Sequence, residues 1–394
     1  MHKVLEYLYS LERFGIKLGL DVMNQLMDVL DHPEKKFKSI HVTGTNGKGS
    51  TCAFLASILR KAGYTVGLYT SPHLIRFNER IKLNGVDISD KDLIRFTSVI
   101  REKLHGIDAT FFEFTTALAF LYFAEKKVDI AVIEVGMGGR LDATNVIVPE
   151  VCVITHVAFD HLEHLGKTLI EIAREKAGIV KTNVPLVTAE THPDVLALFR
   201  KVCHDHGSEM TVVGDAGDWK LSLRGEHQTV NARTAVAALR VIHDIFPVSD
   251  QAIREGLATA KWPGRLMVVS EKPLIILDGA HNLDGMLALR DYIVELPRRK
   301  ILLLGIAEDK DVSAMVKLIV PLFEQVIVTQ GNFKPMDAGK LAGEVRKHCS
   351  NVTIVPSAAE AFRKARASVK KNELLLVTGS LYLVGDVLGV LEHL

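Results

Sequence analysis

The segment HVTGTNGKGST, residues 41–51, has the residue types of a phosphate-binding loop. In the common version of this loop, G-x-x-x-x-G-K-[ST], backbone N–H groups wrap the phosphates, the lysine reaches the outer ones and the hydroxyl holds Mg²⁺. Here the spacer after Gly44 is shorter, and a glycine separates Lys48 from Ser50. An apolar run precedes the loop and a helical pattern follows it, so the helix N-terminus is expected to bind an anion. A plain glycine-rich turn is the alternative, and ATP binding is the favoured interpretation.

A carboxylate and several glycines occur together in VDIAVIEVGMGGRLDATN. Glu134 lies near the end of an expected buried strand, and Gly136, Gly138 and Gly139 follow it. A carboxylate at a strand tip beside a phosphate loop can hold Mg²⁺ directly or through water. The alternative is a capping or ion-paired glutamate at a loop entrance.

Three histidines, His156, His161 and His164, occur close together in THVAFDHLEHLG. Their spacing is not a standard zinc spacing, and no cysteine or glutamate completes a recognised set, so we do not expect zinc. Mg²⁺ prefers oxygen ligands, so these residues by themselves favour a structural role.

Three charged residues further along the chain, Lys176, Arg265 and Asp278, are also candidates for a site. Lys176 lies on an expected amphipathic helix, where a lysine is normally solvated and pairs with neighbouring acids such as Glu175. Arg265 in WPGR could bind a phosphate bidentately, and Asp278 in ILDGAHN could bind ribose hydroxyls or orient the arginine. The alternative for Arg265 and Asp278 is a surface ion pair.

Composition limits the class of protein that can carry these motifs. The chain has 394 residues, 48% of them hydrophobic and 24% charged, which is ordinary for a globular protein of two or three domains. A net charge of +1 gives no sign of a nucleic-acid partner. The four cysteines lack C-x-x-C spacing, which fits a reducing cytoplasm. We expect no signal peptide and no membrane span.

The elements that must position the motifs follow an alternating pattern. Between residue 39 and about residue 190, β-branched apolar runs alternate with helical patterns, which predicts parallel strands with helices on both faces. LSLRGEHQTVNARTAVAALRVI is expected to form a short strand and a helix, and WPGRLMVVS to close this domain. A second alternation begins at PLIILDGAHN and predicts five strands. The fold class is therefore α/β, with a mostly parallel phosphate-loop sheet (residues 1–270) and a smaller Rossmann-like domain (residues 271–394), divided at the polar break Ser270 to Pro273.

Seven segments occur in an order and spacing that is informative as a set. They are GTNGKGS (44–50), YTSPHLIRFNERI (69–81), EVGMGGRLDATN (134–145), FDHLEHLG (159–166), EKAGIVK (175–181), WPGR (262–265) and LDGAHN (277–282). Together they resemble the folylpolyglutamate synthase/dihydrofolate synthase family of the Mur ligase superfamily, from about residue 13 to the C-terminus. The resemblance implies an ATP-dependent ligase whose two domains close over the nucleotide, with the second also binding glutamate.

The resemblance also implies roles for individual residues. The catalytic set is Lys48, Glu134, His161 and Lys176. Ser50 would hold Mg²⁺, and Ser71, Glu134 and His161 match the positions around a second Mg²⁺, which replaces the structural interpretation of His161. Lys176 matches a lysine that is carbamylated in family members. The expected ATP-binding residues are Thr45, Asn46, Gly47, Lys48, Gly49, Ser50, Thr51, Asn231, Arg265, Asp278 and His281.

The segments LGLD (18–21) and FFEFTTA (111–117), the second taken as a loop, resemble pterin-binding parts. The expected pterin-binding residues are Leu20, Asp21, Arg80, Phe112, Glu113, Phe114 and Asp142. The cofactors implied are two Mg²⁺ ions, and K⁺ is also allowed. The substrates implied are ATP, L-glutamate, dihydropteroate and folates, handled by a cytoplasmic monomer that binds neither nucleic acid nor membrane.

The implied chemistry is formation of an acyl phosphate from ATP and a substrate carboxylate, followed by attack of the glutamate amine. One alternative is another Mur-superfamily carboxylate–amine ligase. A muramyl-peptide ligase would need a uridine-diphosphate-binding domain, and the 38 residues before the first expected strand are too few for one. A second alternative is an ATP-dependent switch, which would hydrolyse ATP without a carboxylate or an amine.

Overall fold

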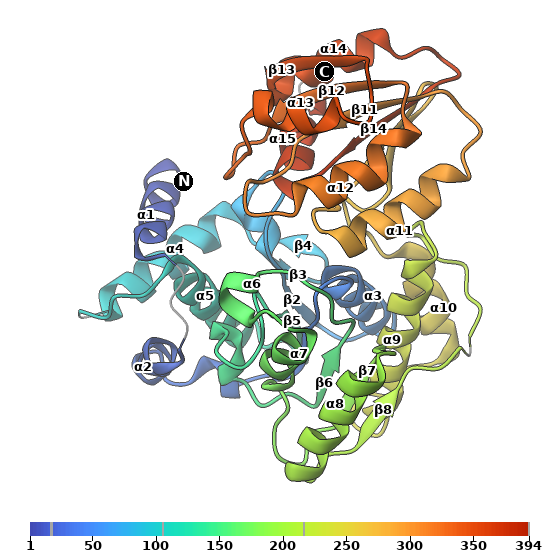
Figure 1. Cartoon of the computed structure of the whole chain (residues 1–394). Helices are drawn as coiled ribbons and strands as arrows, with labels where there is room; N and C mark the ends of the chain where they lie inside the picture. The colour runs from blue at the N-terminus through green and yellow to red at the C-terminus, as the bar shows by residue number, and fades with distance from the viewer. Residues whose placement is uncertain (16–18, 105, 216, 393–394) are drawn as a thin grey trace. The chain divides into compact units, whose positions relative to one another are not determined.

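The computed structural model describes residues 1–15, 19–104, 106–215 and 217–392, and these form two compact units (Figure 1). The first unit consists of Met1–His73, Phe77–Ser222 and Gln228–Ala260, and the second of Leu74–Arg76, Leu223–His227 and Lys261–Leu394. The polypeptide therefore passes from one unit to the other several times, and each unit is described below by itself.

An eight-stranded sheet forms the centre of the first unit, in the order β4-β3-β2-β5-β1-β6-β7-β8. Its strands are β1 (Lys38–Thr43), β2 (Val66–Tyr69), β3 (Ile81–Leu83), β4 (Val86–Asp87), β5 (Ile130–Glu134), β6 (Val151–Ile154), β7 (Leu186–Thr188) and β8 (Met210–Val212). All pairs are parallel except those of β3 with β2 and with β4. The mostly parallel sheet predicted from the alternating pattern is confirmed. The β3–β4 hairpin, which turns at Asn84 and Gly85, both with positive φ, was not predicted.

Strand β1 lies between β5 and β6, although it precedes both in the chain. The chain first moves from β1 past β5 to β2 and later moves from β5 to β6 on the other side, so the strand order reverses at β1. In open parallel sheets, ligands bind beyond the carboxyl ends of the strands at such a reversal. The loops after β1, β5 and β6 are therefore the expected place for a site.

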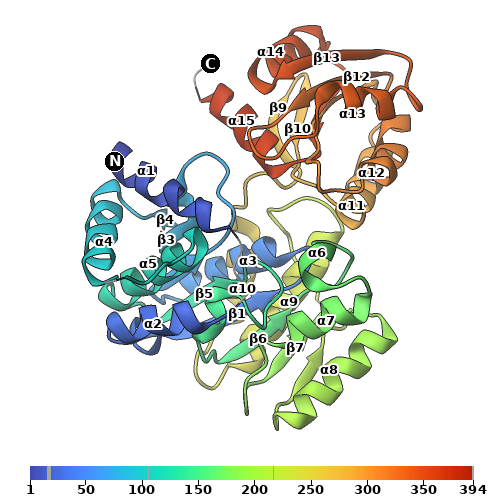
Figure 2. The ribbon, with the colours of Figure 1, turned by 60° about the vertical axis from the view of Figure 1, so that its left-hand side comes forward.

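Helices cover this sheet. They are α1 (His2–Ser10), α2 (Asp21–Val29), α3 (Lys48–Lys61), α4 (Asp90–Lys103), α5 (Phe111–Glu125), α6 (Leu162–Leu165), α7 (Leu169–Ala177), α8 (Pro193–Asp205), α9 (His227–Val241) and α10 (Asp250–Thr259). Short 3₁₀ segments are η1 (Leu11–Phe14), η2 (Pro33–Lys35), η3 (Phe77–Arg80) and η4 (Ala143–Val146). Helices α7 and α8 lie side by side (Figure 2). Helix α3 packs against α10 so closely that a Cβ on Gly256 would lie 2.5 Å from the Cα of Ile58.

Two sequence-based expectations about the predicted first domain, residues 1–270, are wrong. FFEFTTA is not a loop but the first part of helix α5, which Thr110 and Glu113 begin with a reciprocal capping box. Among the described residues, LSLRG forms no strand and leads directly to α9. In the first case the capping residues suggest a loop although they begin a helix. In the second case alternating apolar residues suggest a strand that does not form.

A six-stranded sheet forms the centre of the second unit, in the order β13-β12-β11-β14-β10-β9. Its strands are β9 (Met267–Glu271), β10 (Leu274–Leu277), β11 (Lys300–Leu304), β12 (Gln325–Gln330), β13 (Val352–Ser357) and β14 (Leu374–Thr378), and its helices are α11 (Leu283–Val294), α12 (Val312–Ile319), α13 (Ala338–Val345), α14 (Ala358–Ser368) and α15 (Leu381–Leu391), with η5 (Val320–Leu322) after α12. The five predicted strands, β10 to β14, are parallel, and β9 adds an antiparallel edge.

The division between the units is not at the polar break Ser270 to Pro273. That segment includes the turn between β9 and β10, which pair antiparallel inside the second sheet. The main part of the second unit begins at Lys261 instead. A polar, proline-containing stretch marks a turn as readily as a linker, because both need residues that interrupt regular structure.

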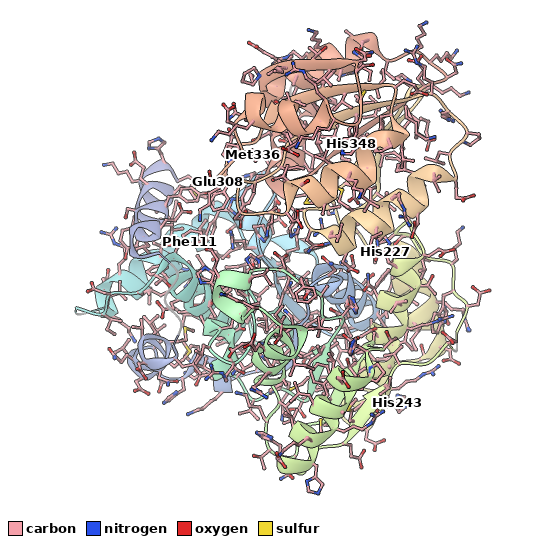
Figure 3. All side chains as sticks on the ribbon, in the orientation of Figure 1. Phe111, His227, His243, Glu308, Met336 and His348 are labelled. Atoms are coloured by element: carbon pink, nitrogen blue, oxygen red, sulfur yellow. The ribbon has the colours of Figure 1, made fainter. Side chains whose placement is uncertain are left out.

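Loops beyond the carboxyl ends of β11 and β12 bind each other. The backbone N–H of Glu308 donates to the carbonyl of Lys334, and that of Met336 donates to the carbonyl of Ile306, each at 3.0 Å. Figure 3 labels Glu308 and Met336 in these two loops. Within the described residues, no helix has the length and apolar character needed to cross a membrane.

Candidate active site

The predicted phosphate loop connects β1 to α3, and its glycines are required by close neighbours. Gly47 is the N-cap of α3 with φ 85°, and a Cβ there would lie 2.3 Å from the side-chain oxygen of Asn231. Gly44 has φ 150°, and a Cβ there would lie 1.9 Å from the hydroxyl oxygen of Thr155. Only glycine adopts such backbone angles freely and leaves room for these side chains. The structure thus brings Asn231, which is predicted to bind ATP, against the loop.

The segment after β6 holds the phosphate loop in place. Thr45 donates its backbone N–H to the carbonyl of His156 at 2.6 Å, and its hydroxyl donates to the carbonyl of Ala158 at 3.0 Å. The hydroxyl of Thr155 donates to the carbonyl of Asn46 at 2.6 Å. A loop tied at three points can present its amide groups to an anion with little reorganisation.

The first turn of α3 supplies the cation and the hydroxyls of the loop. Lys48 donates from Nζ to the carbonyls of Gly44 and Thr45, both at 3.1 Å, so its ammonium lies over the loop. Ser50 and Thr51 are buried, and the Thr51 hydroxyl has no hydrogen-bond partner within the described part of the chain. Gly49, between Lys48 and Ser50, is also buried.

Glu134 lies at the end of β5, next to β1, with only 4% of its surface exposed. Its Oε2 accepts the backbone N–H of Ser71, which follows β2, at 3.1 Å. The predicted metal-site residues Glu134 and Ser71 are therefore brought together from neighbouring strands. His161 begins α6 with a left-handed φ of 51°, and its Nε2 lies 3.9 Å from a carboxylate oxygen of Asp160.

The donor set at these strand ends fits magnesium better than zinc. The described residues contain no group of three His, Cys, Asp or Glu side chains that could hold a metal ion. One carboxylate and nearby hydroxyls suit Mg²⁺, which prefers oxygen and usually keeps several waters.

Lys176 is not the solvated helical lysine that its sequence context alone suggests. It is 3% exposed, and its Nζ donates to the carbonyl of Gly44 at 2.9 Å. Burial, followed by the positive charge of Lys48, lowers the pKa of Lys176 to about 7. The expected partner Glu175 binds Arg140 instead, at 2.8 Å. The structure thus places a lysine with a depressed pKa directly behind the phosphate loop.

Three of the predicted pterin-binding residues surround Tyr69 at the end of β2. The Phe112 ring lies 6.1 Å from the Tyr69 ring, and the charges of Arg80 and Asp142 both act on the Tyr69 hydroxyl, whose pKa is raised chiefly by burial. The Arg80 guanidinium lies 5.1 Å from the centre of the Phe111 ring, which Figure 3 labels at the start of α5. An aromatic ring, a guanidinium and a carboxylate are groups that can bind a flat, polar heterocycle.

The remaining predicted pterin-binding residues lie elsewhere or serve the fold. Glu113 caps α5, and Phe114 is fully buried in the core, so neither side chain is open to a ligand. Leu20 is the N-cap residue of α2, and Asp21, in its first turn, is exposed. The first residue of the predicted LGLD segment, Leu18, lies outside the described residues.

The predicted ATP-binding residues of the second unit lie close to one another. Asp278 is buried and accepts the backbone N–H groups of Leu266 at 2.8 Å and Ala280 at 2.9 Å, so it is not part of a surface ion pair. Arg265 donates to the carbonyl of Gly264 at 3.2 Å. His281 bonds through Nδ1 to the carbonyl of Gly279 at 2.8 Å.

A histidine labelled in Figure 3 extends this group. The charges of Asp278 and Arg265 both act on His227, whose pKa is lowered chiefly by burial. The structure therefore brings Arg265 and Asp278 into one neighbourhood with a third residue that sequence reasoning did not select.

Sequence reasoning also missed several residues of the first unit that support the site. Thr155 and Asp160 lie within the quoted segment THVAFDHLEHLG but were not selected, and Asp160 acts electrostatically on Lys176. His41 and Thr43 lie within the quoted loop segment and bind the loop after β5. The sequence signal that could have found His41 and Thr43 is that they are polar residues in an expected buried strand next to a glycine-rich turn. Buried polar side chains require hydrogen-bond partners.

Comparison with known proteins agrees with this geometry. Residues 42–188 match the model of the Mur ligase middle domain, and residues 264–381 match that of the Mur ligase glutamate ligase domain. The fold and the phosphate-loop site thus define a Mur ligase. The chain is 38% identical to the dihydrofolate synthase/folylpolyglutamate synthase of Bacillus subtilis, over 95% of each chain. It belongs to the folylpolyglutamate synthase/dihydrofolate synthase family and is an ATP-dependent ligase.

Solved structures are similar over nearly the whole chain. E. coli FolC in complex with DHPP and ADP has a TM-score of 0.91 at 32% identity and covers 99% of this chain and 98% of its own. The bifunctional folylpolyglutamate synthase/dihydrofolate synthase of Yersinia pestis, complexed with AMPPNP and a Mn ion, has a TM-score of 0.87 at 32% identity, with 99% and 97% covered. The α/β fold class predicted from the sequence is confirmed.

Proposed function

We propose that this chain joins L-glutamate to two kinds of acceptor, dihydropteroate and reduced folates, and so has both dihydrofolate synthase and folylpolyglutamate synthase activity. The observation that carries the proposal is the phosphate loop packed between Asn231 and Thr155, with Lys48 over it and Glu134 at the neighbouring strand end. Relatives from Bacillus subtilis and E. coli carry both activities in their names and match this chain over 95% and 98% of its length. The aromatic and charged groups around Tyr69 supply surfaces for the heterocycle.

The residues suggest how the first step would proceed. A carboxylate oxygen of the acceptor attacks the γ-phosphorus of ATP, the bond from that phosphorus to the bridging oxygen breaks, and ADP leaves. The loop amides and the Lys48 ammonium stabilise charge on the phosphates. Ser50 and Glu134 would hold one Mg²⁺, and Ser71, Glu134 and His161 would surround the second. When bound, Mg²⁺ neutralises phosphate charge and fixes the reacting groups in line.

In the second step, the glutamate amine attacks the carbonyl carbon of the acyl phosphate. The tetrahedral intermediate collapses, the carbon–oxygen bond to phosphate breaks, and the amine loses a proton as the amide forms. We assign glutamate binding to the second unit, since residues 264–381 match the glutamate ligase domain. Arg265, Asp278 and His281 of that unit are proposed to bind ATP.

We further propose that Lys176 is carbamylated in the working enzyme. CO₂ reacts with the neutral amine, and a pKa near 7 leaves a substantial neutral fraction at physiological pH. Carbamylation replaces a buried positive charge with an anionic oxygen donor of the kind that Mg²⁺ prefers. A cytoplasmic location is proposed, in line with four free cysteines. A monomeric state and the use of K⁺ are further predictions that accompany the family resemblance.

ADP release in the presence of ATP, Mg²⁺ and L-glutamate tests the function, with dihydropteroate in one reaction and tetrahydrofolate in the other. We expect release with either acceptor and none when glutamate or the acceptor is left out. Activity with one acceptor alone would reduce the proposal to one of its two activities. ADP release that needs neither acceptor nor glutamate would favour an ATP-dependent switch instead.

A further inference from the structure

His41 is a buried histidine in β1 that has no role in the proposed chemistry. Its side chain is fully buried, its Nε2 lies 2.8 Å from the hydroxyl oxygen of Thr144, and its Nδ1 has no hydrogen-bond partner within the described residues. Thr144 belongs to η4, which follows the glycine-rich loop after Glu134. A buried imidazole with one satisfied nitrogen calls for an explanation, since buried polar groups are normally paired.

The hydroxyl of Thr144 sets the direction of the hydrogen bonds. It donates to Oδ1 of Asp142 at 2.5 Å, and this oxygen also accepts the backbone N–H of Thr144 at 3.0 Å. The one proton of the hydroxyl therefore goes to Asp142, and Thr144 must accept a hydrogen bond from His41. This assigns the neutral Nε2–H tautomer to His41 and leaves Nδ1 bare. The chain of hydrogen bonds runs from His41 through Thr144 to Asp142.

The electrostatic surroundings keep His41 neutral and so keep the hydrogen bonds from His41 to Asp142 in one direction. Burial, followed by the charge of Lys181, lowers the pKa of His41 to about 3, so the imidazole stays neutral at physiological pH. A second proton on Nδ1 would also have no acceptor within the described residues. The direction of donation therefore does not change over the working range of the enzyme.

Asp142 is held from both of its oxygens. Oδ1 accepts the backbone N–H of Thr144 at 3.0 Å as well as its hydroxyl, and Oδ2 accepts the backbone N–H of Met137 at 2.9 Å. Burial raises the pKa of Asp142, and these donors oppose that effect. The hydroxyl that His41 supports is thus one of the groups that favour the ionised, fixed carboxylate.

The loop after β5, fixed in this way, also packs against Phe112, whose ring lies beside Tyr69. The Phe112 ring lies so close to Gly136 that a Cβ there would be 2.4 Å from Cζ of the ring. On the same face of β1 as His41, the hydroxyl of Thr43 donates to the carbonyl of Gly138 at 2.6 Å. Strand β1 therefore holds the loop at two points, and the aromatic ring rests on it.

We propose that His41 is a positioning residue of the acceptor site: through Thr144 it holds Asp142, and with it the loop after β5 on which Phe112 rests, in the arrangement that receives the acceptor's heterocycle. The proposal rests on the proposed function, because it takes a pteridine as the acceptor. It assigns to His41, a residue of the strand that leads into the phosphate loop, a function that is separate from the chemistry of the phosphates. Loss of this function should therefore weaken binding of the acceptor and leave binding of ATP nearly unchanged.

The test compares Thr144→Val, Thr144→Ser and His41→Phe in the full-length enzyme. Thr144→Val and His41→Phe should raise KM for dihydropteroate by roughly tenfold to hundredfold, the usual effect of removing a buried hydrogen bond to a charged group. KM for ATP should change less than about twofold. Thr144→Ser keeps the hydroxyl and should stay near the parent, and the double variant should be no worse than the poorer single variant, since both break one chain.

Thr97→Val is the matched control, because Thr97 is also buried but its hydroxyl has no partner within the described residues. Its kinetic constants should equal those of the parent. An unchanged KM for dihydropteroate in Thr144→Val, or equal losses for ATP and dihydropteroate, would overturn the proposal. If His41→Phe does not fold, the tautomer of His41 in the parent enzyme decides whether its hydrogen bond runs toward Thr144 and Asp142.

A second readout needs no substrate. ¹⁵N NMR of the histidine-labelled enzyme should find His41 as the neutral Nε2–H tautomer across physiological pH. An Nδ1–H tautomer or an imidazolium would show that the hydrogen bonds do not run toward Asp142. Failure of the proposed function looks different: the parent enzyme would then release no ADP with dihydropteroate and glutamate, whatever the tautomer of His41.

Discussion

Lys176 donates a hydrogen bond from Nζ to the carbonyl oxygen of Gly44 at 2.9 Å, although 132 positions separate the two residues in the chain. Lys48 donates to the same carbonyl oxygen at 3.1 Å. Two ammonium groups therefore converge on one acceptor inside the protein, which is costly for both. Burial and, after it, the positive charge of Lys48 lower the pKa of Lys176, and this depressed pKa supports the proposed carbamylation.

Replacing Lys176 by alanine should nearly abolish ligation, and acetate or formate should partly restore it. The small carboxylates can occupy the space of the proposed carbamate and return its oxygen donors. Ligation rates measured with and without the added acid test this. Lys167→Ala, at an exposed position just before α7, is the control and should retain full activity without rescue. A fully active Lys176→Ala enzyme would remove the carbamate from the mechanism.

The depressed pKa of Lys176 also predicts how stability depends on pH in CO₂-free buffer. The pKa is about 7 in the folded protein and 10.5 for an unperturbed lysine, so between these values the unfolded chain binds more protons. Stability must then rise with pH across that window, by up to about 1.4 kcal/mol per pH unit from this one group. Below about pH 7 the lysine is protonated in both states and contributes no slope.

Comparing the parent with Lys176→Met isolates this contribution, because the other titrating groups are shared. The melting temperature of the parent, relative to that of the variant, should increase between about pH 7 and about pH 9. Equal pH dependence in the two proteins would mean that Lys176 titrates normally.

The parts of the site that sequence could predict were those where chemistry and local pattern coincide. The phosphate loop, Glu134 at its strand end and the parallel order of strands all follow from residue types read against the period of strands and helices. Asn84-Gly85 is a typical hairpin turn, but the strands on either side of it are too short to show an alternating pattern in the sequence. The burial of Lys176 had no local signal, since it depends on which loop packs over α7.

Other errors came from residues whose types suit two structures equally. The stretch from Ser270 to Pro273 has the composition of a linker and of a tight turn, and only the pairing of β9 with β10 distinguishes them. Glu113 has the charge of a ligand-binding residue, but it caps α5. Asp278 could have been a surface ion-pair member, whereas two backbone amides hold it inside the second unit.

Lys48→Ala and Glu134→Gln should each reduce ligation by at least about 10²-fold while the protein stays folded. Each change removes charge that only the phosphoryl-transfer site needs, and positioned electrostatic groups commonly contribute about 10²–10³ in rate. The measurements are ADP release at saturating substrates and thermal unfolding. If either purified variant kept more than half of the parent's rate with unchanged Mg²⁺ dependence, the site assignment would be wrong.

Gly47→Ala should impair ATP binding far more than Gly63→Ala, although both glycines have positive φ, 85° and 96°. A Cβ on Gly63 meets nothing within 4 Å, so that variant carries only the backbone strain, on the order of 1 kcal/mol. A Cβ on Gly47 would lie 2.3 Å from the side-chain oxygen of Asn231 and would push this side chain and the phosphate loop apart. We therefore expect KM for ATP to rise at least about tenfold in Gly47→Ala and to stay within about twofold in Gly63→Ala, with similar melting temperatures for the two proteins.

Adding Asn231→Ala to Gly47→Ala removes the clash: if KM for ATP then recovers toward that of Asn231→Ala alone, the contact with Asn231 is what positions the loop. Equal KM values for the two single glycine variants would show that the loop tolerates the added methyl group and that Asn231 does not fix it.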